Sequence, residues 1–165
     1  MTGVTAQRTA AAKLPPRWFI RGAWTVHRAI HRFTGGRRGL AKPVPGGRFG
    51  MLRLTTTGRR SGKQRAAILG YIEDGPDLVT LAMNGWSDPD PAWWLNLQAS
   101  PDATVELKDG ARAVRARAAE GPERERLWAT ISGYTGYGDD LDAFAARRSS
   151  TAVVVLEPRA PHAEA

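Results

Sequence analysis

Cysteine does not occur in this sequence of 165 residues. Its absence excludes a disulfide framework, a zinc site built on thiolates and a catalytic thiol, and it fits a reducing compartment. The chain also lacks any apolar run long enough to span a membrane, and residues 1–30 lack the apolar segment and cleavage site of a secretory signal. We therefore expect a cytoplasmic protein, and the length favours a single domain.

Acidic residues are missing from the first part of the chain, because the first of them is Glu73. Fifteen Lys and Arg precede it, so residues 1–72 carry a formal charge of +15. From Glu73 onward, nine Lys and Arg face all sixteen Asp and Glu, which gives −7 and leaves the net charge of +8. Such a field attracts a polyanion: a nucleic acid, an anionic lipid or a phosphorylated small molecule. For any single basic residue, a solvated surface is the alternative.

The N-terminal region divides into a tail and a basic helix. Residues 1–16 are rich in Ala and Thr and end in two prolines, which predicts a flexible tail. Residues 17–36 predict an amphipathic helix, with an apolar stripe opposite a face of arginines, that stops at two glycines. This helix either lies on an anionic membrane surface or packs its stripe on the domain. Peripheral attachment to the inner face of the cell membrane therefore stays open.

The remaining chain predicts one domain at residues 48–158, followed by a tail at 159–165. Alternating apolar residues and turn signals predict strands at 50–56, 65–73, 77–83, 103–108, 111–118 and 151–157. Helices are expected at 89–99, 121–131 and 139–148, the last with acids first and arginines last. The predicted fold is α+β, a mainly antiparallel six-stranded barrel with peripheral helices.

The stretch TTTGRRSGKQR at residues 55–65 falls in a loop between two predicted strands. Gly58 and Gly62 allow a tight turn whose backbone amides point outward. Four cations and a hydroxyl donor accompany them: Arg59, Arg60, Lys63, Arg65 and Ser61. The loop is not a Walker A motif, because its spacing is one residue short and Gln64 replaces the magnesium-binding Ser or Thr. It is either an anion site or an ordinary hairpin loop with solvated arginines.

Two further stretches carry aromatic residues. In AWWLNLQA, Trp93 and Leu97 share one helical face, and Trp94 lies about 100° away. Either one tryptophan packs in the core while the other lines a planar ligand, or both are core residues. In GYTGY, Tyr134 and Tyr137 fall in a glycine-rich segment, where a phenol is able to donate a proton or the segment simply caps the preceding helix.

Several chemistries find no support in the sequence. His27 and His31 lie one helical turn apart, but neighbouring arginines disfavour a bound cation, so we expect no metal. No serine stands in a nucleophile elbow and no pair of acids stands out, which argues against hydrolase chemistry. The basic residues lack a recognition helix or stacking strand, so we expect no nucleic-acid partner.

Three stretches in this order, TTTGRRSGKQR, AMNGWSDPDPAWWLNLQASPDATVEL and GYTGY before VVVLEP, resemble the deazaflavin-dependent nitroreductase family. Its members are split β-barrel oxidoreductases that use coenzyme F420, an 8-hydroxy-5-deazaflavin ring on a ribityl phosphate with a lactyl and oligoglutamate tail. The likeness covers about residues 18–158.

The resemblance implies a role for each part of the motifs. The expected contacts with the phosphate and tail come from Arg59, Arg60 and Ser61, with Arg65 anchoring the chain. The residues expected under the ring are Ala66, Ala67, Ile68 and Leu69, and those at its edge are Leu81, Ala82, Met83 and Asn84. The helical residues expected to close the other side are Ala92, Trp93, Trp94, Leu95 and Asn96. Tyr137 and Tyr134 are the implied proton donors.

Two departures from the family pattern concern the acceptor end. Met83 and Asn84 stand where a serine and a lysine are found, and Gly70 replaces a pocket tyrosine while Tyr71 points to the other strand face. Both changes open the pocket and make it less polar. We therefore expect hydride transfer from reduced coenzyme F420 to a quinone, or to another activated unsaturated or nitro acceptor, by a monomer or homodimer. The alternative is a protein that binds or carries the coenzyme without turnover.

Overall fold

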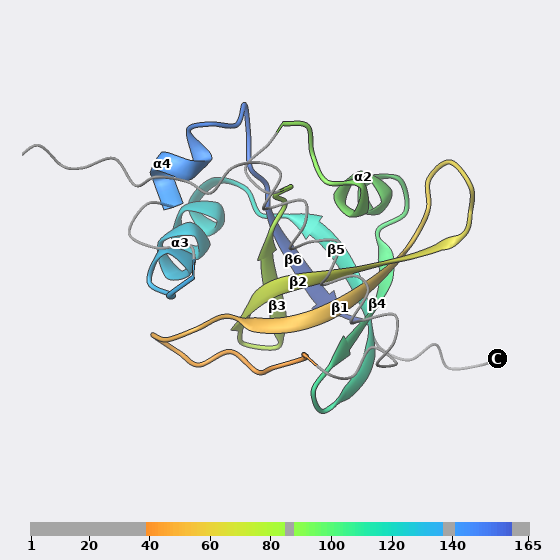
Figure 1. Ribbon diagram of the computed structural model, residues 1–165, viewed down its shortest axis with the longest axis horizontal. Coiled ribbons are helices and arrows are strands. Elements are labelled where there is room, and N and C mark those ends of the chain that lie inside the picture. The colour runs from red at the N-terminus through yellow and green to blue at the C-terminus, as the bar shows by residue number, and fades with distance from the viewer. Residues whose placement is uncertain (1–38, 85–87, 137–140, 160–165) are drawn as a thin grey trace, which may run out of the picture. The chain divides into compact units, whose positions relative to one another are not determined.

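The computed structural model describes residues 39–84, 88–136 and 141–159. Within them, six strands close into an antiparallel barrel in the order β1, β2, β3, β6, β5, β4. Figure 1 shows the barrel with its helices outside it. The strands are β1 (Gly50–Thr57), β2 (Gln64–Asp74), β3 (Asp77–Leu81), β4 (Asp102–Leu107), β5 (Gly110–Ala118) and β6 (Val153–Pro158). All six predicted strands and the predicted α+β barrel are confirmed.

The strands form where the sequence alternates and turns where it offers glycine. Along β1, residues alternate strictly between buried and half-buried, so one face of the strand points into the barrel. The β2–β3 hairpin closes at Gly75 and the β4–β5 hairpin ends at Gly110, and both glycines have positive φ (60° and 148°). The predicted turns are therefore present, because only glycine adopts these backbone angles at no steric cost.

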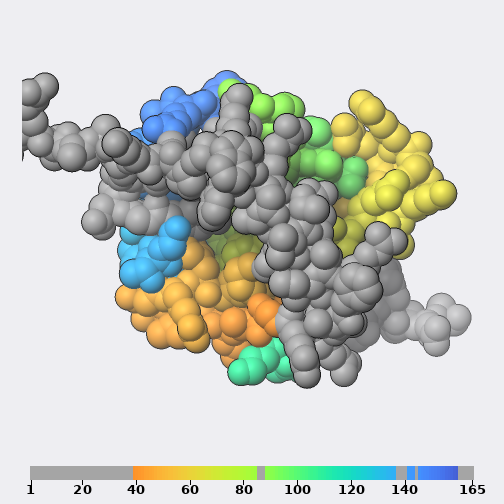
Figure 2. Space-filling model, in the orientation of Figure 1, coloured from red at the N-terminus to blue at the C-terminus, as the bar shows by residue number. Residues whose placement is uncertain are grey.

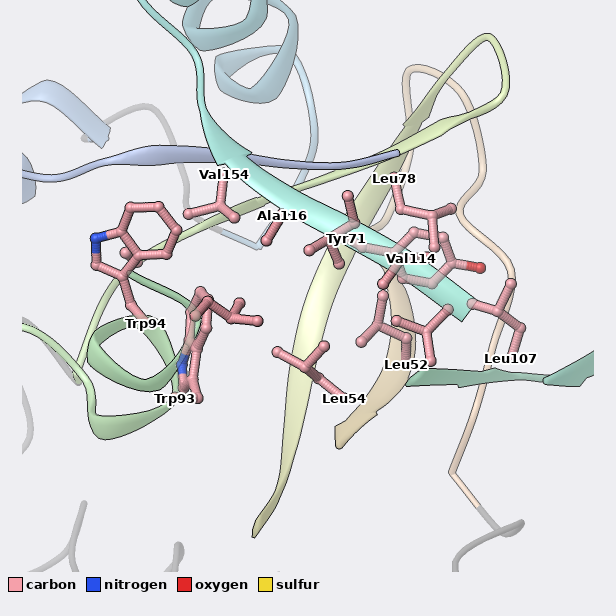
Figure 3. Close-up of a cluster of buried hydrophobic side chains, with 14 residues drawn as sticks. Leu52, Leu54, Tyr71, Leu78, Trp93, Trp94, Leu107, Val114, Ala116 and Val154 are labelled. Carbon is pink, nitrogen blue, oxygen red and sulfur yellow. The ribbon is translucent and has the colours of Figure 1, made fainter. Parts of the chain in front are cut away.

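Two apolar clusters hold the described part of the chain together. The first fills the barrel and includes Leu52, Leu54 and Val114 (Figure 3). The second lies on the outer face of β3 and β6, where Val79 and Val155 pack against two helices. Residues on opposite faces of one strand thus serve different cores, which explains why β6 is apolar at four consecutive positions.

The helices are α2 (Ala92–Ala99), α3 (Gly121–Ser132) and α4 (Leu141–Ala145). In Figure 1, α2 lies beside the long loop between β1 and β2, whereas α3 and α4 lie at the opposite side of the barrel. The predicted helix at 139–148 is too long, because α4 ends at Ala145. The arginines that were expected in its last turn follow the helix instead, and the Arg148 side chain turns into the protein.

Other predicted boundaries also need correction. Strand β3 ends at Leu81 rather than at residue 83. The Ala82 amide donates to the carbonyl of Ala152, which precedes β6, and the Met83 amide donates to the carbonyl of Leu81 in the same segment. The expected helix at 89–99 begins only at Ala92, directly after Pro91. Arg159, predicted to begin a tail, still donates its amide to Ala113 on β5.

Several expectations lie outside the described residues. They are the tail at 1–16, the basic helix at 17–36 with His27 and His31, and Tyr137. The alternatives of membrane contact and packing on the domain therefore remain as the sequence left them. Among the helices that the structure describes, none combines the length and the apolar content needed to span a bilayer.

Candidate functional site

The loop between β1 and β2 is a tight turn that requires glycine at two positions, 58 and 62. Gly58 donates its amide to the carbonyl of Lys63 at 2.8 Å, and Gly62 donates to the carbonyl of Gly58 at 2.7 Å. A Cβ on Gly58 would lie 3.0 Å from both the Lys63 carbonyl oxygen and the Ser61 hydroxyl, and Gly62 has φ +65°. Figure 2 shows this loop, in yellow, at the right of the view, beside the green atoms of the α2 region.

Four backbone amides of the loop do not point outward as the sequence predicted. Those of Gly58, Ser61 and Gly62 donate to carbonyls within the turn. The amide of Arg59 donates to the side chain of Asn96 at 3.1 Å. The prediction of a backbone anion cradle is therefore wrong, because the tight turn uses these donors itself. An anion held here would instead meet side chains.

The side chains of the loop carry concentrated positive charge. Its three cations, Arg59, Arg60 and Lys63, are exposed, and so is a fourth, Arg65, at the start of β2. Across the described ranges, none of the four takes part in an ion pair. Like charges crowded on one short loop repel one another, so a bound polyanion would relieve that repulsion. The anion site expected from the sequence therefore stays a prediction, and it now rests on side chains alone.

Helix α2 fastens this loop through one amide side chain. Asn96 accepts the bond from Arg59 and donates from Nδ2 to the Thr56 hydroxyl at 3.1 Å. Thr56 lies at the end of β1, and both side chains are buried. The structure therefore brings the predicted loop and the predicted helix together, although 37 residues separate Arg59 from Asn96 in sequence.

The two tryptophans of α2 are core residues. Trp93 and Trp94 are 8% and 6% exposed and meet edge to face, with ring centroids 6.3 Å apart. Figure 3 shows both indoles projecting from α2 into the barrel cluster, with Trp94 near Val154. Of the two interpretations in the sequence, the packing of both in the core agrees with this geometry. Their contact with a cofactor stays a prediction, and little indole surface is open to one.

Strand β2 divides its residues between the two faces of the barrel wall. Ala67 and Leu69 pack against the interior cluster, so Ala66 and Ile68 point outward. Tyr71 is buried inside, as the alternation predicted, and burial together with the Glu73 carboxylate raises its pKa to about 12. A phenol so enclosed cannot serve a pocket on the outer face.

Gly50 makes room for that enclosed ring. A Cβ at Gly50 would lie 2.5 Å from the Tyr71 ring and 2.8 Å from the carbonyl oxygen of Ala41. A Cβ at Gly50 could not shift away from the Tyr71 ring, because the Ala41 carbonyl is part of the backbone and does not move aside. Glycine at position 50 and the buried Tyr71 ring therefore require each other.

Two of the four predicted ring-edge residues and one predicted tyrosine come from separate segments but pack in one cluster. Leu81 belongs to the second apolar cluster, as does Tyr134, and Met83 packs against it. Tyr134 is 9% exposed and stacks on Phe49 with centroids 5.3 Å apart. Ala82 is fully buried, and Asn84 is exposed. The end of β3 and the segment after α3 therefore pack in one cluster, and their role at an acceptor stays a prediction.

A buried ion pair near this region had no signal in the sequence. The Arg148 side chain is fully buried and its Nη2 lies 3.1 Å from Asp90 Oδ1. Beside it, the Asp88 carboxylate accepts bonds from the Ser149 amide at 3.3 Å and hydroxyl at 3.2 Å. These two acids fasten the segment before α2 to the segment before β6.

Metal ligands do not gather in the described ranges, where no three His, Cys, Asp or Glu side chains could share an ion. The described residues offer an exposed cationic loop fastened to helix α2 and, separately, a partly apolar region around Met83; that the two belong to one site stays a prediction. This combination suits a ligand with an anionic part and a flat apolar part.

Comparison with known proteins identifies the family. A family model described as F420H(2)-dependent quinone reductase matches residues 24–158. Rv3178 of Mycobacterium tuberculosis, named as a candidate F420H(2)-dependent quinone reductase, is 33% identical over 122 residues, which are 73% of this chain and 96% of the relative. The F420H(2)-dependent quinone reductase Rv1261c of the same organism is 32% identical over 109 residues, which are 65% of this chain and 71% of Rv1261c.

Solved structures agree with the family and the fold. An F420-H2 dependent reductase superposes with a TM-score of 0.57 and 27% identity, covering 65% of this chain and 93% of the other. A chain described as a domain-swapped dimer superposes with a TM-score of 0.61 and 25% identity, covering 87% of this chain and all of the other. The expected resemblance and the split-barrel fold are confirmed, and this chain belongs to the F420H(2)-dependent quinone reductase family.

Proposed function

We propose that this protein is an oxidoreductase that uses reduced coenzyme F420 to reduce a quinone. The observation that carries the proposal is the β1–β2 loop with the start of β2, where four exposed cations have no ion-pair partner among the residues that the structure describes. A phosphate followed by an oligoglutamate tail supplies the charges that such a loop lacks. Membership of the family supplies the independent support.

The residues of this chain fit the two parts of the coenzyme. Arg59 and Arg60 offer planar guanidinium groups that bind phosphate or carboxylate with two parallel bonds, and Ser61 adds a hydroxyl. Ala66 and Ile68 present apolar side chains on the outer face of β2, opposite Thr55 and Arg53 of β1, and a flat ring would lie against them there. When bound, the reduced deazaflavin supplies the two electrons as a hydride from C5.

The protein must also manage one proton. A quinone that accepts a hydride needs one proton to become a hydroquinone, and an acid placed beside the acceptor oxygen lowers the barrier. Tyr134 is the described candidate, because it packs in the same cluster as Leu81 and Met83. Tyr137 is the second candidate from the resemblance. The apolar surface of Met83 favours a hydrophobic acceptor such as a quinone over a polar nitro compound.

The direct test mixes the purified protein with reduced coenzyme F420 and menadione without oxygen, and follows the recovery of deazaflavin absorbance. We expect oxidation of the coenzyme in step with loss of quinone. Tyr134→Phe should slow turnover about tenfold while leaving the affinity for the coenzyme unchanged, since the phenol acts on the acceptor. Coenzyme binding without oxidation by any quinone or nitro compound would instead establish a carrier protein. No binding of the coenzyme would reject the proposal.

Contact with a membrane and self-association are further parts of this proposal. The predicted basic helix at 17–36 would bring the site to quinones dissolved in lipid. Co-sedimentation with vesicles that contain anionic lipid should fall when residues 1–36 are removed, and unchanged sedimentation would reject the helix as the anchor. Because one similar structure is described as a domain-swapped dimer, sedimentation velocity should distinguish a monomer from a homodimer.

A further inference from the structure

Asn96 joins the aromatic helix to the cationic loop. It lies on α2 and is 5% exposed. Its Oδ1 accepts the backbone N–H of Arg59 at 3.1 Å, and its Nδ2 donates to the Thr56 hydroxyl at 3.1 Å. Thr56 in turn directs its hydroxyl toward the carbonyl of Arg65 at 3.4 Å. The buried Asn96 side chain thus contacts Arg59 directly and is linked to Arg65, at the start of β2, through Thr56.

The position of Asn96 is fixed by the core. Its neighbours on α2, Trp93 and Leu97, are buried in the barrel cluster, so the helix cannot rotate without emptying that cluster. Asn96 therefore presents its amide at a constant place, and the Arg59 backbone is held against it. Since a buried donor without a partner is costly, the bond resists loosening of the loop.

Contact of Asn96 with a ligand is limited by the same geometry. A side-chain amide has two N–H donors and two lone pairs, and one of each is used here by Thr56 and Arg59. The remaining donor and lone pair belong to a side chain that is almost wholly buried. The amide accordingly faces the protein rather than the outer surface of the loop.

We infer that Asn96 is a positioning residue for the anion-binding loop: by holding the Arg59 amide, it sets the direction in which the Arg59 and Arg60 guanidinium groups leave the backbone. It acts on the phosphate and tail of the coenzyme through those arginines, and not on the ring. This inference rests on the proposed function. It changes the role that the family resemblance implied for Asn96, which was direct contact with the cofactor.

The test compares two ligands that differ only at the anionic end. Coenzyme F420 carries the phosphate and tail, and 8-hydroxy-5-deazariboflavin carries the same ring and ribityl chain alone. Quenching of tryptophan fluorescence gives a Kd for each. We expect Asn96→Leu to raise the Kd for coenzyme F420 about tenfold and that for 8-hydroxy-5-deazariboflavin less than twofold. An equal rise for both ligands, or no rise for either, would overturn the inference.

Thr56→Val is the matched control within the network. It removes the hydroxyl that Asn96 Nδ2 reaches but leaves the Asn96 bond to Arg59 in place. We expect its Kd for coenzyme F420 to stay within threefold of the parent value. An effect as large as that of Asn96→Leu would show that buried packing, rather than the Arg59 bond, controls affinity, and would overturn the inference.

A measurement on the unmodified protein covers the case in which Asn96→Leu does not fold. Amide hydrogen exchange, followed by NMR, should show the Arg59 amide protected at least tenfold more than that of Arg60, because Asn96 holds only the former. Equal exchange of the two amides would overturn the inference. Failure of the unmodified protein to bind either deazaflavin would reject the proposed function instead, and leave the exchange result standing.

Discussion

Two arginine-rich regions of this barrel differ in what surrounds their charges. On the side of β5 and α3, Arg117 lies 2.6 Å from Glu123 and 2.6 Å from Glu157, and joins three elements. Arg126 makes two bonds to Asp74, at 2.8 and 2.9 Å. These arginines bind carboxylates supplied by the chain itself, so they act as structural ties.

The β1–β2 loop presents the opposite arrangement. Its cations are exposed, and none pairs with a carboxylate of the described ranges. The net charge of +8 counts both regions alike, although only one of them leaves its charge available to a ligand. Pairing, rather than composition, therefore separates a binding arginine from a structural one. The predictions below separate the two regions by affinity and by stability.

The largest expected effect concerns the most buried of the paired arginines. Asp90→Ala removes the carboxylate that lies 3.1 Å from the fully buried Arg148 side chain. We expect a loss of about 3 kcal/mol in the free energy of unfolding, because the buried guanidinium keeps its desolvation cost while this ion pair is lost. Urea denaturation measures this loss. The double variant Asp90→Ala/Arg148→Met should regain part of the stability, and no recovery would contradict the assigned cause.

Neutralising the loop should affect binding and not stability. Arg59→Gln combined with Arg60→Gln should raise the Kd for coenzyme F420 about 30-fold, or about 2 kcal/mol, since charge-assisted bonds to an exposed anion are lost. The urea midpoint should stay unchanged or rise slightly as crowded like charges are removed. Fluorescence titration and urea denaturation of the same sample test both parts. A lower urea midpoint with an unchanged Kd for coenzyme F420 would show that the loop arginines stabilise the fold rather than bind the coenzyme.

The converse variant is Arg117→Met. It should lower the free energy of unfolding by about 1 kcal/mol, a modest value because the side chains of this network are partly exposed to solvent. The Kd for coenzyme F420 should change less than twofold, since Arg117 belongs to the paired region. A loss of affinity comparable to that of the loop variant would break the distinction between the two regions.

The smallest effect is a dependence of stability on pH. The Arg126 guanidinium lowers the pKa of Asp74, and that of Arg117 lowers the pKa of Glu123. A carboxylate whose folded-state pKa lies below its unfolded value stabilises the fold above the unfolded pKa, and that contribution is lost as the pH falls through the folded pKa. The urea midpoint should therefore fall as the pH drops from about 5 to about 3. Arg126→Met should make that fall shallower; an equal slope would contradict the Asp74 contribution.

Much of the fold follows from local patterns in the sequence. The six strands are encoded by alternation or by short runs of apolar, β-branched residues, and Gly75 and Gly110 mark hairpins, so no distant contact is needed to predict them. The ends of β3 and α4 were predicted too far along, because a bond from Ala82 to Ala152 and the inward turn of Arg148 decide them. Such contacts join residues that are far apart in sequence.

The candidate site was predictable in its parts and not in its connections. The glycine spacing and the cations of the loop are visible in the sequence, but the use of the amides within the turn depends on backbone geometry. The Asn96 link spans 37 residues and the Arg148 pair spans 58, and no periodic pattern encodes either contact. Burial of both Trp93 and Trp94 depends on how α2 sits on the barrel mouth.

The most direct test of the functional assignment is the affinity of the unmodified protein for coenzyme F420 and for 8-hydroxy-5-deazariboflavin, each at low and high salt. We expect coenzyme F420 to bind at least tenfold more tightly at low salt, with the difference shrinking as salt screens the loop cations. The smaller ligand should respond little to salt. Equal affinity for the two ligands at low salt would contradict the claim that the unpaired cations of the β1–β2 loop bind the anionic end of the coenzyme.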